Sequence, residues 1–196
     1  MSYVETTDDV YEWCPELFEI NDETLRRNTA DALFDAPEYF WTVSTDSYYH
    51  PEEHGARHGL LLHTKRVASV FNRLTPSMEK QEHLTEYETD CGMAACLLHD
   101  TFKYGEPPTE TGSGTYGAND KLAADYYRDH HGELPYDVTA AIEAHKGPWG
   151  RGSPPTSHLQ QMVHIADQIA ATGFIDVGVK EPNDTLVEHF SSLRER

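Results

Sequence analysis

Cysteine is scarce in this sequence, and the few cysteines are not spaced as a functional set. The 196 residues contain three, Cys14, Cys91 and Cys96, with neither a Cys-x-x-Cys motif nor a second pair. This spacing excludes a disulfide framework and disfavours a structural zinc site, which is usually built from cysteine with histidine. Cys91 and Cys96 lie in an apolar run, so we expect reduced thiols packed in the core.

Basic residues are also few, because 15 Lys and Arg stand against 34 Asp and Glu, which gives a formal charge of −19. No basic stripe is present that could steer a long nucleic acid, so a nucleic-acid substrate would have to be short or held locally. Concentrated salt screens such self-repulsion within about 3 Å, and a halophilic source is therefore the preferred interpretation. The alternative is an acidic protein that avoids nucleic acid.

Long hydrophobic runs are missing as well. No stretch approaches the roughly 18 apolar residues that a membrane-spanning helix needs. The first 20 residues carry acids rather than a basic and then apolar leader. We therefore expect a soluble, cytoplasmic protein without a membrane partner. No segment alternates convincingly as a strand, so the expected fold is all-α, a compact bundle of five to seven helices.

The length suits one compact domain, with room for an N-terminal extension. We expect a helical extension, a core domain and a C-terminal tail, at residues 1–50, 51–175 and 176–196. Within the extension, the aromatic cluster at 39–41 is interpreted as part of the core rather than as a pocket wall, since large aromatic side chains are mostly buried. Tyr48-Tyr49 follows in a less regular stretch.

Helical periodicity, capping residues and breakers predict the positions of the helices. The expected helices begin at about residues 21 or 22, 59, 86, 119, 137 and 156 or 157, and they end at about residues 35, 74, 102, 129, 144 and 171 respectively. The second should end at Thr75-Pro76, because proline does not normally continue a helix. The third is apolar on every side between Met93 and Leu98, as expected for an element buried in the middle of a bundle.

Ionisable residues recur on the inner faces or at the ends of these helices: His63, His99 with Asp100, His145 and Asp167. Each alone has an ordinary explanation as a hydrogen-bonded core residue, a cap or a salt-bridge partner. Together they favour a metal site, because burying imidazoles and carboxylates without a cation is costly and one divalent ion satisfies all of them.

The helical faces support this interpretation. Leu159, Val163 and Ala170 share a face with Asp167, which directs its carboxylate inward. The apolar residues before His145 direct its ring to the core in the same way. His164 lies on a more polar side and is left out of the ligand set.

Imidazole and carboxylate ligands suit a divalent ion such as Mn, Ni, Fe, Co, Zn or Mg, with open positions for water and a phosphate oxygen. The spacing of the ligands does not choose among these ions.

Four stretches of the sequence, HGLLLHTKRVA, AACLLHDTFKYG, AIEAHKG and MVHIADQIA, resemble the HD-domain superfamily of metal-dependent phosphohydrolases. In that superfamily a His on one helix, a His-Asp doublet at the end of a second and an Asp on a later helix hold the metal. The resemblance runs from about His54 to Ala171. It implies an HD-domain helical bundle with four metal ligands, His63, His99, Asp100 and Asp167.

Within the superfamily, the phrases HGLLLHT, GSPPT and HIADQI are most similar to the HD domain attached to bacterial 3'-to-5' exoribonucleases. The nucleic-acid-binding domain that precedes the HD domain in those enzymes has no room here, so we do not expect processive RNA degradation.

The sequence departs from the two-metal members of the superfamily. Those members place a further His about midway between the doublet and the residue that matches His145, and the corresponding GTYGANDKLAAD contains none. Asn119 or Asp120 could substitute, and His130 or His131 could reach in from a helix end. We favour one metal, with a second site possible.

The resemblance implies that a metal-activated water hydrolyses a phosphate ester of a nucleotide or a short phosphodiester. Asp100 would accept a proton, and His145 would be an acid-base group or a weak second-site ligand. Lys103, one helical turn after the doublet, would neutralise the phosphate or be a solvated surface residue. The nearby aromatic residues Tyr104, Tyr116 and Trp149 could stack on a base.

Two other classes stay open. Some relatives with this fold use a di-iron centre for oxygen chemistry. The second class is a non-catalytic regulatory module, in which the metal is structural and the acidic surface binds a basic partner. The sequence does not predict the oligomeric state.

Overall fold

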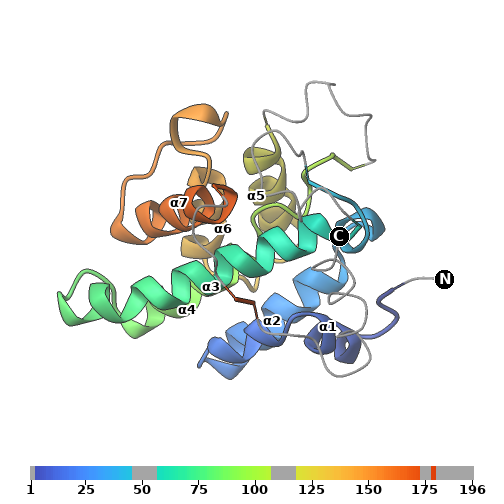
Figure 1. The fold of residues 1–196 in the computed structure, drawn as a ribbon, viewed down its shortest axis with the longest axis horizontal. Helices are drawn as coiled ribbons and strands as arrows, with labels where there is room; N and C mark the ends of the chain where they lie inside the picture. The colour runs from blue at the N-terminus through green and yellow to red at the C-terminus, as the bar shows by residue number, and fades with distance from the viewer. Residues whose placement is uncertain (1–2, 46–56, 107–117, 173–177, 180–196) are drawn as a thin grey trace.

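The structure is a computed structural model that describes residues 3–45, 57–106, 118–172 and 178–179. Over these ranges it is all-helical, with seven α-helices and three short 3-10 helices, which confirms the predicted fold class (Figure 1). The predictions for Tyr48-Tyr49, His54 and Tyr116, and nearly all of the predicted tail, fall outside the described residues.

The α-helices are α1 (Thr7–Trp13), α2 (Glu23–Phe34), α3 (Gly59–Lys80), α4 (Glu86–Leu98), α5 (Asn119–His130), α6 (Tyr136–Ala144) and α7 (His158–Ala171). The 3-10 helices are η1 (Pro15–Glu19), η2 (Glu38–Trp41) and η4 (Gly147–Trp149). The sequence predicts α2 and α5 to α7 closely, whereas α1 and η1 were not predicted.

Side-chain caps explain where the well-predicted helices begin. The Asp22 carboxylate accepts hydrogen bonds from the backbone N–H groups of Thr24 and Leu25 at the start of α2. Thr85 and Glu88 form a reciprocal capping box at the start of α4. Such caps satisfy backbone donors that have no partner within the helix, so each one fixes a helix start.

Two helix ends differ from the prediction. α3 does not stop at Thr75-Pro76 but continues to Lys80, with Pro76 inside the helix. The Thr75 hydroxyl donates to the Phe71 carbonyl at 2.7 Å, and so bonds a backbone acceptor in the turn that the proline disturbs. α4 ends at Leu98 rather than near Phe102, because the chain turns at His99.

α4 lies at the centre of the bundle and packs against α2, α3, α6 and α7. Figure 1 shows α1 and α2 on one side of the long helix α3, and α5, α6 and α7 on the other. Gly92 of α4 permits the close approach to α3 and α7. A Cβ atom there would collide with the Phe71 ring and would lie 2.7 Å from Leu159 Cδ1. The apolar centre of α4 is buried, as the sequence predicts.

The N-terminal elements are joined to the rest of the bundle by buried polar contacts. The ammonium group of Lys65, on α3, donates to Glu16 Oε2 at 2.6 Å and to the Trp13 carbonyl at 2.9 Å. Asp90, on α4, accepts from the backbone N–H groups of Asn21 and Asp22. The apolar side chains of these N-terminal segments also belong to the same hydrophobic core as those of α3 and α4.

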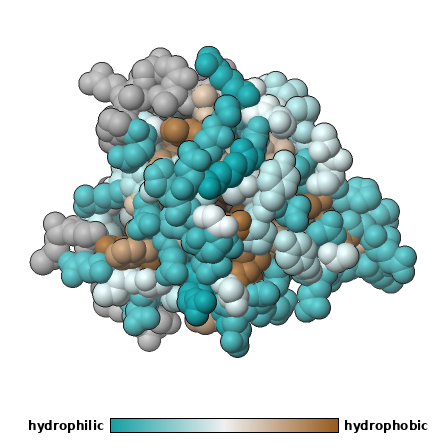
Figure 2. All heavy atoms as spheres, turned by 180° about the vertical axis from the view of Figure 1, so that it is seen from behind, coloured by the Kyte–Doolittle hydropathy of each residue, from teal (hydrophilic) through white to brown (hydrophobic). Residues whose placement is uncertain are grey.

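The aromatic cluster and the cysteines lie where the sequence predicts. Phe40 and Trp41 of η2 are buried in the core. All three cysteines are free and buried. The face of the molecule seen in Figure 2 is covered mainly by hydrophilic residues, with small apolar patches between them. Among the described residues, none of the helices combines the length and the apolar character needed to cross a membrane.

Candidate metal centre

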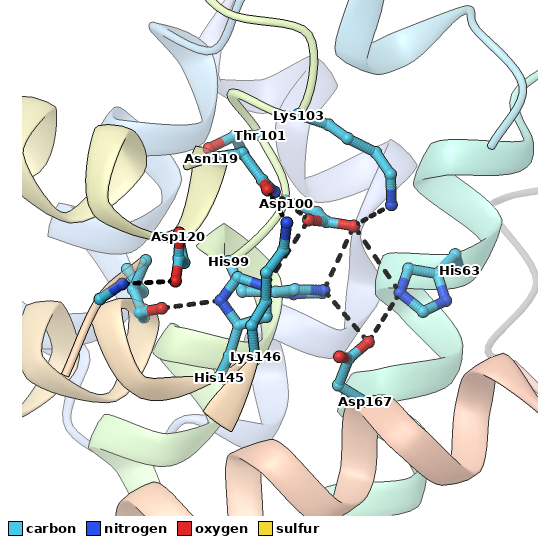
Figure 3. Close-up of polar contacts among 12 residues, drawn as sticks. His63, His99, Asp100, Thr101, Lys103, Asn119, Asp120, His145, Lys146 and Asp167 are labelled. Carbon is cyan, nitrogen blue, oxygen red and sulfur yellow. Dashed lines mark hydrogen bonds and ion pairs between the residues drawn. The ribbon is translucent and has the colours of Figure 1, made fainter. Parts of the chain in front are cut away.

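Four side chains from three helices meet inside the bundle (Figure 3). His63 comes from α3, His99 and Asp100 come from the end of α4, and Asp167 comes from α7. The two histidines are fully buried, and the carboxylate residues are only 2% and 9% exposed. The structure therefore brings together the four residues that the sequence selects as ligands.

The nitrogen and oxygen atoms of these side chains face one another. His63 Nε2 lies 3.1 Å from Asp167 Oδ1 and 3.8 Å from Asp100 Oδ2. His99 Nε2 lies 3.7 Å from Asp100 Oδ2 and 3.8 Å from Asp167 Oδ1. Three of these four separations are too long for hydrogen bonds, so the imidazoles and carboxylates face one another without closing on each other.

Helix ends orient two of the imidazoles. His99 directly follows the last residue of α4, and His145 directly follows the last residue of α6. Each ring bonds through Nδ1 to the carbonyl three residues earlier, at 2.8 Å and 2.7 Å. Since a carbonyl can only accept, Nδ1 carries the proton in both rings. Nε2 therefore presents its lone pair to the site, which is the orientation that metal-binding histidines adopt.

The donor set fits a divalent cation. His99 Nε2 is buried and has no hydrogen-bond partner among the described residues. Its lone pair faces carboxylate oxygens, an arrangement that is repulsive unless positive charge lies between them. Two ligands at about 2.1 Å from one ion stand about 3.0–3.4 Å apart. The His63–Asp167 separation of 3.1 Å lies in that range, and the other three, at 3.7–3.8 Å, are slightly longer. Imidazole and carboxylate without thiolate suit Mn, Fe, Co, Ni or Zn.

The protonation states also suit a metal. Burial, followed by the nearby Lys103 ammonium, lowers the pKa of His63 well below its usual value. Burial, followed by His99, lowers the pKa of His145 to about 4. Both rings are therefore neutral at pH 7, the form in which an imidazole can bind a metal.

Lys103 is buried beside the site and not on the surface. It is 7% exposed, and its ammonium group donates to Asp100 Oδ2 at 2.6 Å. Burial alone would raise the pKa of Asp100, but Lys103 and the neighbouring imidazoles outweigh it and lower that pKa well below the usual value. Burial alone would lower the pKa of Lys103, but the Asp100 carboxylate outweighs burial, so the pKa of Lys103 is raised above its usual value. The pair therefore stays ionised, and the interpretation of Lys103 as a solvated residue is wrong.

Asn119 and Lys146 complete the site on its other side. Asn119 Nδ2 donates to Asp100 Oδ1 at 2.7 Å, and the Lys146 ammonium group donates to Asn119 Oδ1. Sequence reasoning considered Asn119 only as a substitute ligand and missed Lys146. The available signal was the position of Lys146 directly after His145 at a helix end.

The other substitutes considered for the missing histidine are engaged elsewhere. Asp120 Oδ2 accepts hydrogen bonds from the backbone N–H groups of Arg151 and Gly152, and so anchors the loop after η4. His131 lies 3.3 Å from an Asp35 carboxylate oxygen, and His130 bonds the Tyr126 carbonyl. His145 does reach the site, with Nε2 at 3.8 Å from Asp100 Oδ1.

The two described aromatic candidates differ in exposure. The Tyr104 hydroxyl donates to the Ser44 carbonyl at 2.9 Å, and its ring packs edge-on against Tyr39. Trp149 is 69% exposed, with its ring centroid 5.8 Å from that of His164. His164 bonds the His145 carbonyl through Nδ1 and is not directed at the ligands. Substrate stacking by Tyr104 or Trp149 stays a prediction.

The sequence matches a known protein family. The sequence model of the HD domain family matches residues 60–172. The chain belongs to the HD domain family. The match spans α3 to α7 and contains all four candidate ligands. No curated protein and no solved structure matches the chain.

Membership of the HD domain family generally indicates a metal-dependent phosphohydrolase, and this HD domain has buried His and Asp groups that could hold a metal. The family match covers the core and does not distinguish among HD subfamilies. The closer resemblance to the exoribonuclease HD domains therefore stays a prediction.

Proposed function

We propose that this HD domain hydrolyses a phosphate ester of a nucleotide or a short phosphodiester, with His63, His99, Asp100 and Asp167 as ligands of one divalent cation. The observation that carries the proposal is that two buried imidazole nitrogens each lie within 3.8 Å of the same two carboxylates, with the His99 lone pair facing both acids. A divalent cation bound there would polarise a phosphoryl oxygen and lower the pKa of a bound water.

Two groups of the chain are placed to accept the proton of the attacking water. Asp100 is ionised, and His145 is neutral with its Nε2 lone pair directed to the site, 3.8 Å from Asp100 Oδ1. Because a ring with a pKa of about 4 carries no spare proton at pH 7, His145 is better suited to ligation or proton acceptance than to protonating the leaving oxygen.

Lys103 supplies positive charge to the phosphate. Its ammonium group is already held by Asp100, so little side-chain freedom is lost when an anionic substrate arrives. In this buried position the charge is weakly screened and stabilises a developing negative charge more than a surface lysine would.

A small substrate agrees with the charge of the molecule. The formal charge of −19 disfavours a long polyanion, which leaves mononucleotides and short phosphodiesters. The nucleotide part of the proposal is supported by the resemblance to exoribonuclease HD domains and by the exposed Trp149 ring beside His164, which offers a face for a base.

The test combines elemental analysis with a screen of nucleotides and model phosphodiesters in high salt, with each candidate metal supplied in turn. The wild type should bind metal and hydrolyse at least one phosphate ester. Asp100→Ala should lose both metal and turnover, whereas His145→Ala should keep the metal. His83→Ala, which changes a histidine outside the ligand set, is the matched control and should keep both.

Three other results would contradict parts of this proposal. Full metal occupancy in Asp100→Ala would contradict the ligand assignment. Metal binding without hydrolysis of any phosphate ester would reject the enzymatic proposal and favour a regulatory module. Iron absorbance with oxygen uptake would favour the di-iron class.

A further inference from the structure

A second group of potential ligands lies on the His145 side of the site. His99, Asp100 and His145 are all buried, and one ligand atom from each lies within 4.8 Å of the others. By residue type this group could hold another cation. The geometry around it points to a different occupant.

Only two donors of this second group remain once the first cation is bound. His99 uses Nδ1 to bond the Cys96 carbonyl, so it offers a single ligand atom, Nε2, and both groups require that atom. Asp100 Oδ1 and His145 Nε2 are left, 3.8 Å apart. Protein sites for divalent metals usually provide three or more ligands.

Lys146 brings a positive charge to the same place. Its ammonium group donates to Asn119 Oδ1, and Nδ2 of that amide donates to Asp100 Oδ1 at 2.7 Å. One amide group therefore connects the ammonium group to the oxygen that a second metal would need. Figure 3 shows Lys146 and Asn119 on the His145 side of Asp100, with His63 on the other side.

The surroundings make this ammonium group a strong partner for an anion. Burial lowers the pKa of Lys146, and the Asp100 carboxylate is the main influence that opposes the shift. Lys146 is half-buried, so part of its hydration is already removed before it binds an anion, and its hydrogen bonds to anionic oxygens are charge-assisted.

We propose that Lys146 is the resident cation of the His145 side of the site: it keeps a second divalent ion out and binds a phosphate oxygen of the substrate. The phosphate part rests on the proposed function. Lys103 at Oδ2 and Lys146 through Asn119 at Oδ1 then place positive charge on both sides of Asp100. The site operates with one metal and two ammonium groups.

The first experiment measures metal stoichiometry by titrating the metal-free protein with Mn²⁺ at fixed KCl concentration. The wild type should bind one equivalent tightly. Lys146→Met removes the positive charge and keeps most of the aliphatic side chain. This variant should bind a second Mn²⁺ at least about tenfold more tightly than the wild type does, because the ammonium group no longer repels the metal ion. Lys121→Met, in an exposed pair with Asp125, is the matched control and should behave as the wild type.

The second experiment measures the binding of inorganic phosphate to the Mn²⁺-loaded protein by calorimetry. Lys146→Met should weaken phosphate binding at least about tenfold, whereas Lys146→Arg, which keeps the charge, should stay within about threefold of the wild type. Because a guanidinium can also donate a hydrogen bond to Asn119, the arginine variant separates loss of charge from loss of local structure.

The outcomes separate this inference from the proposed function. Tight binding of two Mn²⁺ equivalents by the wild type would overturn the role of Lys146. Unchanged affinities of Lys146→Met for the second Mn²⁺ and for phosphate would overturn it as well. Either result would leave the phosphohydrolase proposal standing. A wild type that binds no divalent metal would reject the proposed function, and with it the inference.

Discussion

Asn119 acts at the metal centre without belonging to the predicted ligand set. Its amide donates to Asp100 Oδ1 and accepts from Lys146, so it fixes the rotation of the Asp100 carboxylate. Groups that orient a ligand in this way contribute to metal affinity although they do not contact the ion.

We therefore expect Asn119→Ala to lower metal affinity by about 10-fold to 100-fold. Competition with a chromogenic chelator would measure the change. Asn28→Ala is the control, since Asn28 makes an exposed hydrogen bond to the Glu133 carbonyl far along the chain and should leave metal affinity unchanged. Equal affinities for the two variants would show that Asn119 does not orient the ligand.

At the scale of residues, the sequence predicts the ligands better than their partners. His63 and Asp167 could be found because apolar residues at helical spacing direct them inward. Apolar spacing does not direct Lys103 or Lys146 inward, and the position of Lys146 directly after His145 is a weak signal, since a lysine after a helix end is usually solvated. Their burial depends on how α5 and the α6–α7 connection close over Asp100, which the sequence does not state.

At the scale of elements, Gly92 controls how closely α4 approaches α3 and α7. We expect Gly92→Ala to lower the free energy of unfolding by about 1–3 kcal/mol, because overpacking against Phe71 and Leu159 exceeds the gain in helix propensity. Urea unfolding would measure it. Gly132→Ala, where a Cβ meets nothing within 4 Å, is the matched control. A Gly92→Ala protein as stable as that control would contradict the close packing.

The ion pair between η1 and α3 gives a second prediction for an element contact. Lys65→Met leaves the Glu16 carboxylate buried without this cation and should cost about 3–5 kcal/mol in urea unfolding. Adding Glu16→Gln to that variant should restore part of the loss, because the buried charge is removed. Lys121→Met, at an exposed pair, should change the midpoint little. A small effect of Lys65→Met alone would indicate that water reaches Glu16.

The helices could be predicted where local chemistry decides them. Asp22, Thr85 and Ser157 cap α2, α4 and α7, and their side chains fix the start of each helix. The prediction failed at Pro76, where tertiary packing of the long helix α3 outweighs the local cost of proline. α1 was not predicted, since its seven residues are too few to show a clear period.

At the scale of the whole molecule, net charge dominates. A formal charge of −19 on 196 residues produces strong self-repulsion, and hydrophilic residues cover most of the face seen in Figure 2. We expect the urea midpoint to rise between about 0.1 M and 2 M KCl, as the screening length falls from about 10 Å to below 3 Å. Sucrose at equal osmolality is the control and should stabilise less. A midpoint that KCl leaves unchanged would argue against a halophilic adaptation.

The all-α class could be predicted from the absence of strand alternation, but the arrangement of the helices could not. Periodicity shows which face of a helix is buried, and it does not show which helix covers that face. The division at residue 50 stays a prediction, although η1 and α2 share the hydrophobic core with α3 and α4.

Anomalous X-ray scattering from crystals of the Mn²⁺-loaded protein would locate the bound metal directly. We predict one strong peak bounded by His63 Nε2, His99 Nε2 and carboxylate oxygens of Asp100 and Asp167, with no equal peak beside Lys146. A fully loaded crystal whose peak lies outside these four residues would contradict this prediction.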